Sequence, residues 1–497
     1  TIAGSGADGF AGDGGPANAA SMGNLQWSTV TPDGRVYIND QRNGRVRRVA
    51  PALPDLSDND TIVIAEDGSE LYIFDPRGRH LRTIDGLTNM LVYRFEYDAA
   101  GSLVRVVDGD GNVTRIERTG DLVNAIVAPG GQRTVLTVDG RGYLTAVANP
   151  GGPTWEMGYQ DDGLLTSFRT PNGYEATMTY DAQGLLLTDT DAAHGGWTIK
   201  REQTGDLQTT TMTSAEGRVF TYNVERQPDW LVRRETIDPA GLRSVTVTSP
   251  AGTSFTTAPD GTTIFTAMGA DPRFGTQAPI LEQATITTPG GLTANIVGTR
   301  NAIFADPSNH FTATFIEDIV RVNGREFYVS YDGSTRTMED WSPAGRNTVT
   351  VFDEVGRVAS WQPPALTPVQ FTYDASRGRV TALTQGTRQA TIAYDTLNQP
   401  NAVTDPLGRQ VRFEYDAAGR VTKQTLPGGR EIRFGYDANG NITSLSPPGR
   451  PEHLFTYTPV DLAATYAPPL VAGTGPTRFE YNLDRQLTRI TRPDGPN

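Results

Sequence analysis

Cysteine is absent from the 497 residues of this sequence, and lysine and histidine are rare. The absence of cysteine excludes disulfide bonds, thiol nucleophiles and cysteine-ligated metals. The two lysines, Lys200 and Lys423, lie outside any glycine-rich loop, which excludes a P-loop. The four histidines are scattered and form no H-E-x-x-H pair. No apolar run approaches the ~18 residues that a membrane-spanning helix needs.

Basic runs and helical periodicity are also missing. The formal net charge is −14, so nucleic acid is not an expected partner, and the acidity mainly favours solubility. Most carboxylates follow an aromatic residue or precede glycine, and these are turn positions rather than signs of acid–base chemistry. The sequence contains no G-x-S-x-G motif. We therefore expect no catalytic centre, no cofactor and no tightly bound metal.

A strict repeat is what the sequence does contain. Seven aromatic residues stand 21 residues apart: Tyr331, Phe352, Tyr373, Tyr394, Tyr415, Tyr436 and Tyr457. An aspartate follows each of the first six, and a glycine often closes the group: Asp332, Asp353, Asp374, Asp395, Asp416 and Asp437, with Gly356, Gly419 and Gly440. The same group occurs earlier as Tyr97-Asp98 with Gly101 and as Tyr180-Asp181 with Gly184. A fixed period of this length is the mark of a repeat architecture.

Each repeat predicts a β-hairpin. In Ile432, Phe434 and Tyr436 apolar side chains take every second position, as in a half-buried strand. The strand then meets Asp-x-x-Gly, where aspartate can bond the backbone ahead and glycine supplies a positive φ. In the other strand Ile442 and Leu445 stand three apart, which indicates a bulge or a change of face. Two strands per repeat give roughly 35–45 strands, too many for a flat open sheet.

The repeated unit names a family. The segments 415–422, 436–443 and 405–409 resemble YD repeats, also called RHS repeats, of bacterial Rhs proteins, toxin-complex C subunits and animal teneurins. The resemblance implies an all-β fold: one long antiparallel sheet of hairpins that spirals into a hollow shell. In the bacterial members that shell encloses a toxic C-terminal segment. Stacked sandwiches are the structural alternative.

The resemblance also predicts a domain division. Residues 1–50 resemble an NHL repeat, a β-propeller blade unit, and form a blade fragment or cap. Residues 51–497 form the YD shell, with irregular repeats at about 225–330 and regular ones at 331–457. Within the irregular part, the segment from Gly269 to Pro279 is the candidate for an inserted loop.

Three short motifs favour ordinary turns over function. The G-x-G-x-x-G match from Gly4 to Gly9 has no helix after it, so we interpret it as a β loop. The segment from Asp108 to Asn112 resembles the start of a calcium loop but lacks the later ligands, and a tight turn is the preferred interpretation over weak Ca²⁺ binding. Asp405 to Gly408 resembles part of the Rhs self-cleavage signature, yet complete repeats follow it. We expect any such protease segment to lie outside this chain.

These observations predict a structural shell of a secreted or cell-surface protein, with its own C-terminal polypeptide as cargo. The first alternative is a teneurin-like adhesion or recognition protein, whose partner would be another protein or a cell-surface receptor. The second is a carbohydrate-binding protein that uses an Asp-rich surface to hold a glycan.

Overall fold

The computed structural model describes residues 3, 9, 20–30, 36–49, 60–306, 312–469, 475–493 and 495–496. Strands make up 59% of the chain and helical residues 2%. The helical residues include two short 3-10 turns, η2 (Gln41–Asn43) and η3 (Pro228–Trp230). The predicted all-β fold is confirmed: among the described residues, the strands from β4 onward pair antiparallel in one long sheet.

Most strands are four to nine residues long, and the longest lie between β23 and β27. The first half of the chain contains β1 (Leu25–Val30), β2 (Val36–Asp40), β3 (Arg45–Val49), β4 (Thr61–Ile64), β5 (Glu70–Phe74), β6 (His80–Asp85), β7 (Leu91–Tyr97), β8 (Leu103–Asp108), β9 (Val113–Thr119), β10 (Leu122–Val127), β11 (Arg133–Val138), β12 (Leu144–Ala148), β13 (Thr154–Tyr159), β14 (Leu165–Arg169), β15 (Glu175–Tyr180), β16 (Leu186–Thr190), β17 (Gly196–Thr204), β18 (Leu207–Ser214), β19 (Val219–Arg226), β20 (Val232–Ile237) and β21 (Arg243–Thr248). The second half contains β22 (Thr253–Thr257), β23 (Thr263–Asp271), β24 (Gly275–Thr287), β25 (Thr293–Phe304), β26 (Ala313–Val322), β27 (Arg325–Asp332), β28 (Thr337–Trp341), β29 (Asn347–Phe352), β30 (Val358–Gln362), β31 (Val369–Tyr373), β32 (Val380–Gln385), β33 (Arg388–Tyr394), β34 (Pro400–Thr404), β35 (Gln410–Tyr415), β36 (Val421–Thr425), β37 (Glu431–Tyr436), β38 (Ile442–Ser446), β39 (His453–Tyr457), β40 (Ala463–Ala467), β41 (Thr477–Tyr481), β42 (Leu487–Arg492) and β43 (Gly495–Pro496).

The N-terminal strands β1, β2 and β3 form a sheet of their own. Asp40 at the end of β2 is fully buried and accepts a 3.0 Å hydrogen bond from the Gly23 amide. The G-x-G-x-x-G match lies outside the described residues except for Gly9, and so do residues 10–19 of the segment that resembles an NHL repeat. The division at residue 50 and the blade assignment stay predictions.

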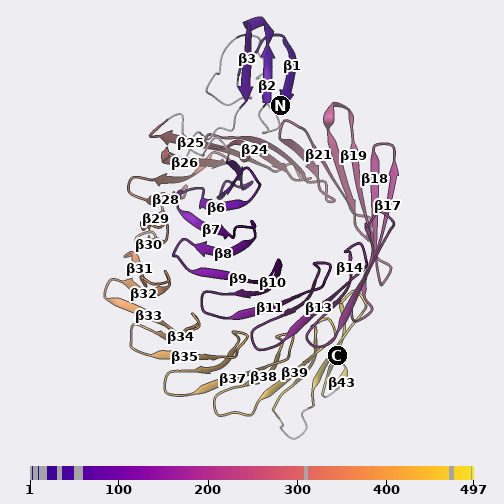
Figure 1. Ribbon diagram of the computed structural model, residues 1–497, viewed down its shortest axis with the longest axis vertical. Coiled ribbons are helices and arrows are strands. Elements are labelled where there is room, and N and C mark those ends of the chain that lie inside the picture. Colours follow the sequence, from indigo (N-terminus) through magenta and orange to yellow (C-terminus); the bar gives the residue numbers. More distant parts are fainter. Residues whose placement is uncertain are drawn as a thin grey trace. The chain divides into compact units, whose positions relative to one another are not determined.

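The chain divides into two compact units. Unit 1 comprises residues 1–94, 226–233 and 244–368, and unit 2 comprises residues 95–225, 234–243 and 369–497. Within each unit, strands pair antiparallel with their neighbours in the chain, as in β25–β26–β27 of unit 1 and β35–β36–β37 of unit 2. Figure 1 shows the regular run from β31 to β39 as successive rungs of one ladder.

A β-bulge recurs at one position of the repeat. In the β37–β38 pair, Gly435 faces Ser444 while Tyr436 faces Ile442, which leaves Thr443 as an extra residue. The same register shift occurs between the repeat aromatic and the residue before it in other hairpins: β13–β14, β15–β16, β29–β30, β31–β32, β33–β34, β35–β36, β39–β40 and β41–β42. The bulge expected near Ile442 and Leu445 is therefore confirmed, and it explains their three-residue spacing.

The sheet is a thin wall rather than one layer of a packed sandwich. In β35, Arg412 and Glu414 are exposed, while Val411, Phe413 and Tyr415 are only half-buried. The accessible surface area of the chain is 28568 Å². A compact monomer of 53.6 kDa would expose about 18,000 Å², and two separate compact halves about 21,500 Å². The excess disfavours the sandwich alternative whatever the placement of the two units.

The predicted loop from Gly269 to Pro279 is wrong. Its residues belong to β23 and β24, which pair through two register shifts, and a tight turn joins them. Phe274 and Ala278 pack with Ile64 and Leu71 in the core of unit 1. Each bulge adds a residue to one strand, so the apolar residues no longer stand at every second position. The buried hairpin therefore looked irregular in the sequence.

Candidate functional site: repeated turns and the seam between them

The repeated turn is held by the aspartate that follows each aromatic residue. One carboxylate oxygen of Asp416 accepts hydrogen bonds from the Ala418 and Arg420 amides, both at 3.0 Å. The Gly419 amide donates to the Asp416 carbonyl at 3.0 Å. Gly419 has a φ of 83°, in the left-handed region where a side chain would add strain. Aspartate and glycine therefore act together to reverse the chain.

The structure places most of the predicted repeat residues in this arrangement. Asp98, Asp181, Asp353, Asp395 and Asp437 each accept a turn amide four residues ahead. The closing glycines have positive φ values: Gly101, Gly184, Gly356 and Gly440. Two turns depart from the pattern. Asp374 has a turn one residue longer, closed by Gly378, and Asp332 has one in which Arg336 adopts the positive φ.

The repeat tyrosines link neighbouring repeats through their hydroxyl groups. The Tyr436 hydroxyl donates to the Val421 carbonyl at 2.8 Å, fifteen residues earlier. Tyr180, Tyr394, Tyr415 and Tyr457 make the equivalent bond. Burial raises the pKa of Tyr436, as it does for the other partly buried members Tyr394, Tyr415 and Tyr457.

Equivalent placement on successive hairpins is thus confirmed for these tyrosines, whereas direct ring stacking is confirmed only in part. The rings of Tyr331 and Phe352 meet edge-to-face at 6.1 Å. At Tyr394 and Tyr436 an arginine from the preceding turn lies over the ring instead, at 4.4 and 4.8 Å. Tyr97 and Tyr373 end their strands at the same place in the repeat.

Those arginines are site residues that the sequence analysis missed. Arg420 contacts Asp416 at 2.7 Å, donates to the Asp437 carbonyl at 2.9 Å and covers the Tyr436 ring. The Arg379 guanidinium bonds Asp374 and holds the pKa of that carboxyl well below its usual range. The signal was available, because arginine often follows the closing glycine, at positions 79, 357, 409 and 420. Arg379 and Arg420 each join one turn to the next.

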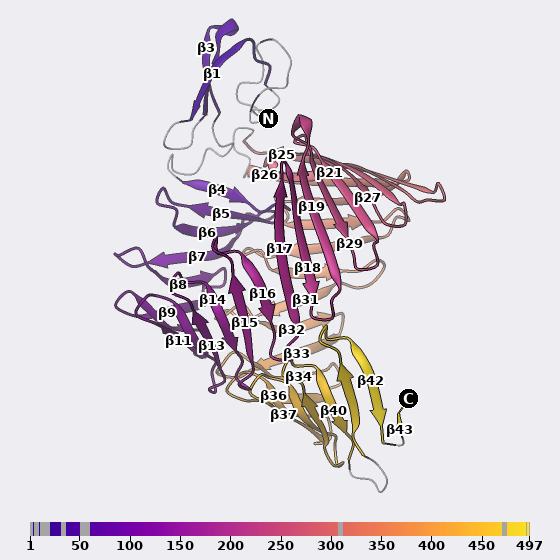
Figure 2. The ribbon, with the colours of Figure 1, turned by 90° about the vertical axis from the view of Figure 1, so that its right-hand side faces the viewer.

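Unit 2 contains a seam in which two distant rows of turns meet. The Asn172 side chain donates to the Asp437 carboxylate at 3.0 Å, and the Asn172 amide donates to Asn439 at 2.9 Å. Further along the seam Gln132 donates to the Leu397 carbonyl, and Asn112 donates to the Arg377 carbonyl. The strands that carry these turns are drawn in purple and in orange to yellow in Figure 2.

The seam keeps a constant register. Its hydrogen bonds join residues 265 to 270 positions apart, from Asn112 with Arg377 to Ser214 with Asp484. Two further contacts reach the adjacent turn instead, from Arg377 to Pro129 and from Arg485 to Asp191. Unit 1 has an equivalent contact between Gly356 and Met90. They lie so close that a Cβ added to Gly356 would be 3.1 Å from the Met90 side chain. A constant register means that the same two turn surfaces meet repeat after repeat.

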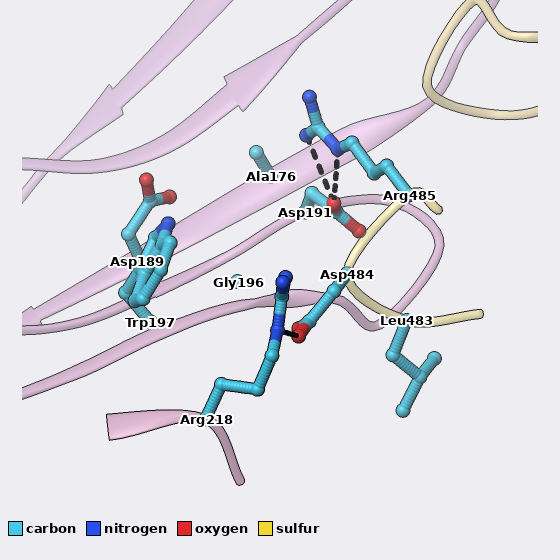
Figure 3. A pocket seen from close by; sticks show the side chains of 9 residues that line it. All are labelled: Ala176, Asp189, Asp191, Gly196, Trp197, Arg218, Leu483, Asp484 and Arg485. Atoms are coloured by element: carbon cyan, nitrogen blue, oxygen red, sulfur yellow. Dashed lines mark hydrogen bonds and ion pairs between the residues drawn. The ribbon is translucent and has the colours of Figure 1, made fainter. Parts of the chain in front are cut away.

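One end of the seam is ionic. Arg218 pairs with Asp484, and Arg485 pairs with Asp191 at 2.8 Å, so two ion pairs cross the same junction (Figure 3). Burial opposes ionisation of Asp484, but bonds from Ser214 and Arg218 outweigh it and keep its pKa below the usual value. These side chains line a cavity of about 400 Å³ beside Trp197.

The other predicted motifs lie where turns were expected. Asp108 accepts bonds from the amides of Asp110 and Asn112, and Asp405 accepts them from those of Leu407 and Arg409. Both turn interpretations are confirmed. Within the described ranges, no group of three or more potential ligands could hold a metal ion. Over the same residues, no helix is long and apolar enough to cross a membrane.

The repeated turn, the tyrosine hydroxyl bonds between neighbouring repeats and the thin sheet agree with a known family. The Teneurin YD-shell family model matches residues 58–497. This chain belongs to the teneurin YD-shell family. Teneurin-1 of Gallus gallus is 26% identical over 412 residues, which cover 78% of this chain and 14% of that protein. Teneurin-1 of Homo sapiens is 26% identical over 413 residues, with the same two shares.

The YD-shell chain thus spans about a seventh of the length of these teneurins. Among solved structures, the crystal structure of TcdB2-TccC3 without its hypervariable C-terminal region is similar over 95% of this chain and 26% of that chain. The sequence identity is 13% and the TM-score is 0.39, too low to support a conclusion about function.

Proposed function

We propose that this YD-shell chain is the wall of a hollow container that encloses a polypeptide, such as a toxin segment of its own full-length protein. The container would keep that cargo apart from the producing cell. It would be secreted or displayed at the cell surface, and it would act without catalysis, cofactor or metal.

The seam is the observation that carries this proposal. In the seam, hairpin turns of the sheet contact other hairpin turns of the same sheet at a nearly constant sequence separation. Such contacts join the ends of the strands and bury neither face of the sheet. The large accessible surface supports the same interpretation, because a compact body of this mass would expose far less. Alternating exposed charged and half-buried apolar positions leave one face able to contact contents while the other meets solvent.

The lack of cysteine makes a direct test possible. Arg412 and Gln424 lie on opposite faces of neighbouring strands, because Arg412 faces Thr425, the residue after Gln424. Single variants Arg412→Cys and Gln424→Cys would be treated with a small maleimide and with a bulky polyethylene-glycol maleimide. We expect the small reagent to label both variants and the bulky one to label only one. Equal labelling by the bulky reagent would overturn the enclosure proposal.

A second candidate function is recognition of another protein at a cell surface. The observation that favours it is the match to teneurins. In that case both faces of the sheet would remain accessible to a bulky reagent, so the labelling experiment separates the two candidates.

A further inference from the structure

The seam joins two kinds of turn with opposite hydrogen-bonding character. We name the turns at 108–112, 128–132, 149–153, 170–174, 191–195 and 214–218 the donor row, and the turns at 374–379, 395–399, 416–420, 437–441 and 482–486, each of which follows a tyrosine, the acceptor row. Seven of the seam hydrogen bonds run from the donor row to the acceptor row. Three run the other way. Carboxylates and turn carbonyls of the acceptor row therefore receive most of the bonds.

Successive hairpin turns lie alternately at the two ends of the strands, and we call each line of turns an edge. Each segment of unit 2 therefore has a second edge outside the seam. In the segment 369–497 this second edge holds the turns at 405–409, 426–430 and 447–450, whose Pro-x-Gly sequences match those of the donor-row turns at 128–132, 149–153 and 170–174. In the segment 95–225 it holds the turns at 139–142, 160–163 and 181–184, which follow Val138, Tyr159 and Tyr180 and so occupy the place of the Tyr-Asp turn in the repeat. We call these the free donor edge and the free acceptor edge.

Both free edges are exposed. Leu407 on the free donor edge is 76% exposed, and the Asp161 side chain on the free acceptor edge is fully exposed. The corresponding seam turns are half-buried at Pro129 and Asn172. The free edges thus present turn surfaces of the kind that the seam covers.

The two free edges are complementary in charge and in spacing. The donor edge presents Arg430 and Arg450, which flank a surface cavity of about 550 Å³, and neither has a carboxylate partner among the described residues. The three turns of the acceptor edge carry four aspartates, Asp139, Asp161, Asp162 and Asp181, against one arginine, Arg141, which pairs with Asp139 and Asp161. Turns begin at 405, 426 and 447 on one edge and at 139, 160 and 181 on the other, so both repeat every 21 residues. Two strands per repeat space the turns by about 9.6 Å on either edge.

We propose that the free donor edge binds the free acceptor edge of a second copy of this chain, and so repeats between molecules the seam that unit 2 makes within itself. The contact is heterologous, because the two surfaces differ, and it can therefore add further copies head to tail. Its exposed charges make the association dependent on ionic strength.

Sedimentation velocity of the full chain over a concentration series tests this proposal. At low ionic strength we expect the weight-average mass to rise with concentration, and at high ionic strength to return to that of the monomer. The double variant R430E/R450E should weaken association at least tenfold, and so should the triple variant D161R/D162R/Q183R, which makes the acceptor edge basic. The matched control R412E changes an exposed arginine on a strand face and should leave association unchanged.

Mixing the two reversed variants is the decisive arm. Each alone should be monomeric, and the mixture should associate, because the acidic donor edge of one then meets the basic acceptor edge of the other. Circular dichroism melting confirms that every variant is folded. A wild-type chain that stays monomeric at low ionic strength overturns the proposal. So does an equal effect of R412E, or a mixture that fails to associate.

Discussion

The side-chain amide of Asn172 donates a 3.0 Å hydrogen bond to the carboxylate of Asp437, 265 residues further along the chain. Burial opposes ionisation of Asp437, but hydrogen bonds from Asn441 and Asn172 outweigh it and hold its pKa below the usual range. This bond is one of a series in the same register, and the series ties two rows of turns together. Several measurable consequences of the repeat depend on it or on the turns that present it.

Removing the Asn172 side chain should weaken the seam at one point. We expect Asn172→Ala to lower the free energy of unfolding by about 1 kcal/mol, because a partly buried bond to a charged acceptor is lost. Denaturant unfolding followed by tryptophan fluorescence measures the change. The matched control Gln183→Ala alters an exposed turn outside the seam and should change stability by less than about 0.5 kcal/mol. Equal effects would mean that the seam bond contributes nothing.

Arg420 should not be replaceable by lysine. Its guanidinium contacts the Asp416 carboxylate and the Asp437 carbonyl while it covers the Tyr436 ring. An ammonium group cannot make these contacts together. We expect Arg420→Lys to lower the unfolding free energy by roughly 1–2 kcal/mol, whereas Arg412→Lys on an exposed strand position should be neutral. An unchanged unfolding free energy in Arg420→Lys would show that a positive charge alone is enough to hold successive turns together.

The turn glycines should tolerate asparagine better than alanine. Gly408 has a φ of 76°, and a Cβ there would meet nothing within 4 Å, so backbone strain alone opposes substitution. Asn398 occupies the equivalent position of another turn with a φ of 73°. Gly408→Ala should lower the unfolding free energy by about 1 kcal/mol and Gly408→Asn by less than half of that. Equal losses would contradict a conformational origin.

Asp340 should destabilise the folded chain at neutral pH. Burial raises the pKa of its carboxyl, so folding disfavours the charged form. The destabilisation is present above the raised folded pKa and disappears below the unfolded value near 3.9. We expect Asp340→Asn to raise the unfolding free energy at pH 7 by up to about 0.5 kcal/mol, and to have no effect near pH 3. A loss of stability at pH 7 would instead reveal a favourable partner for this carboxylate.

The turn and seam carboxylates should make stability fall in acid. Asp374, Asp437 and Asp484 all have folded pKa values below the unfolded one. Their contribution is complete above the unfolded pKa and is lost as the pH falls through the folded values. The denaturant midpoint should therefore decline only below about pH 4. Asp484→Asn should flatten that decline, and a loss already complete at pH 5 would contradict this assignment.

Local chemistry explains what the sequence could predict. Aspartate and glycine in Asp-x-x-Gly set a turn through atoms within five residues, so the turns at Asp181 and Asp416 followed from the pattern. Alternation at Val411, Phe413 and Tyr415 likewise fixed the strands, and the three-residue spacing of Ile442 and Leu445 predicted the bulge.

The seam could not be predicted in this way. Asn172 and Asp437 belong to ordinary turns, and nothing within either turn records that they meet across 265 residues. The hairpin at Asp271 was missed for a related reason. Its register shifts removed the alternation, and its burial depends on distant contacts such as that of Arg273 with the Gly86 carbonyl.

Small-angle X-ray scattering on the folded monomer, at an ionic strength that prevents association, tests the central claim most directly. A compact body of 497 residues would have a radius of gyration of about 23 Å. A hollow container predicts a value clearly above this limit and a reconstructed envelope with an internal void. A radius of gyration at the compact limit, with no void, would contradict enclosure and leave recognition as the better account.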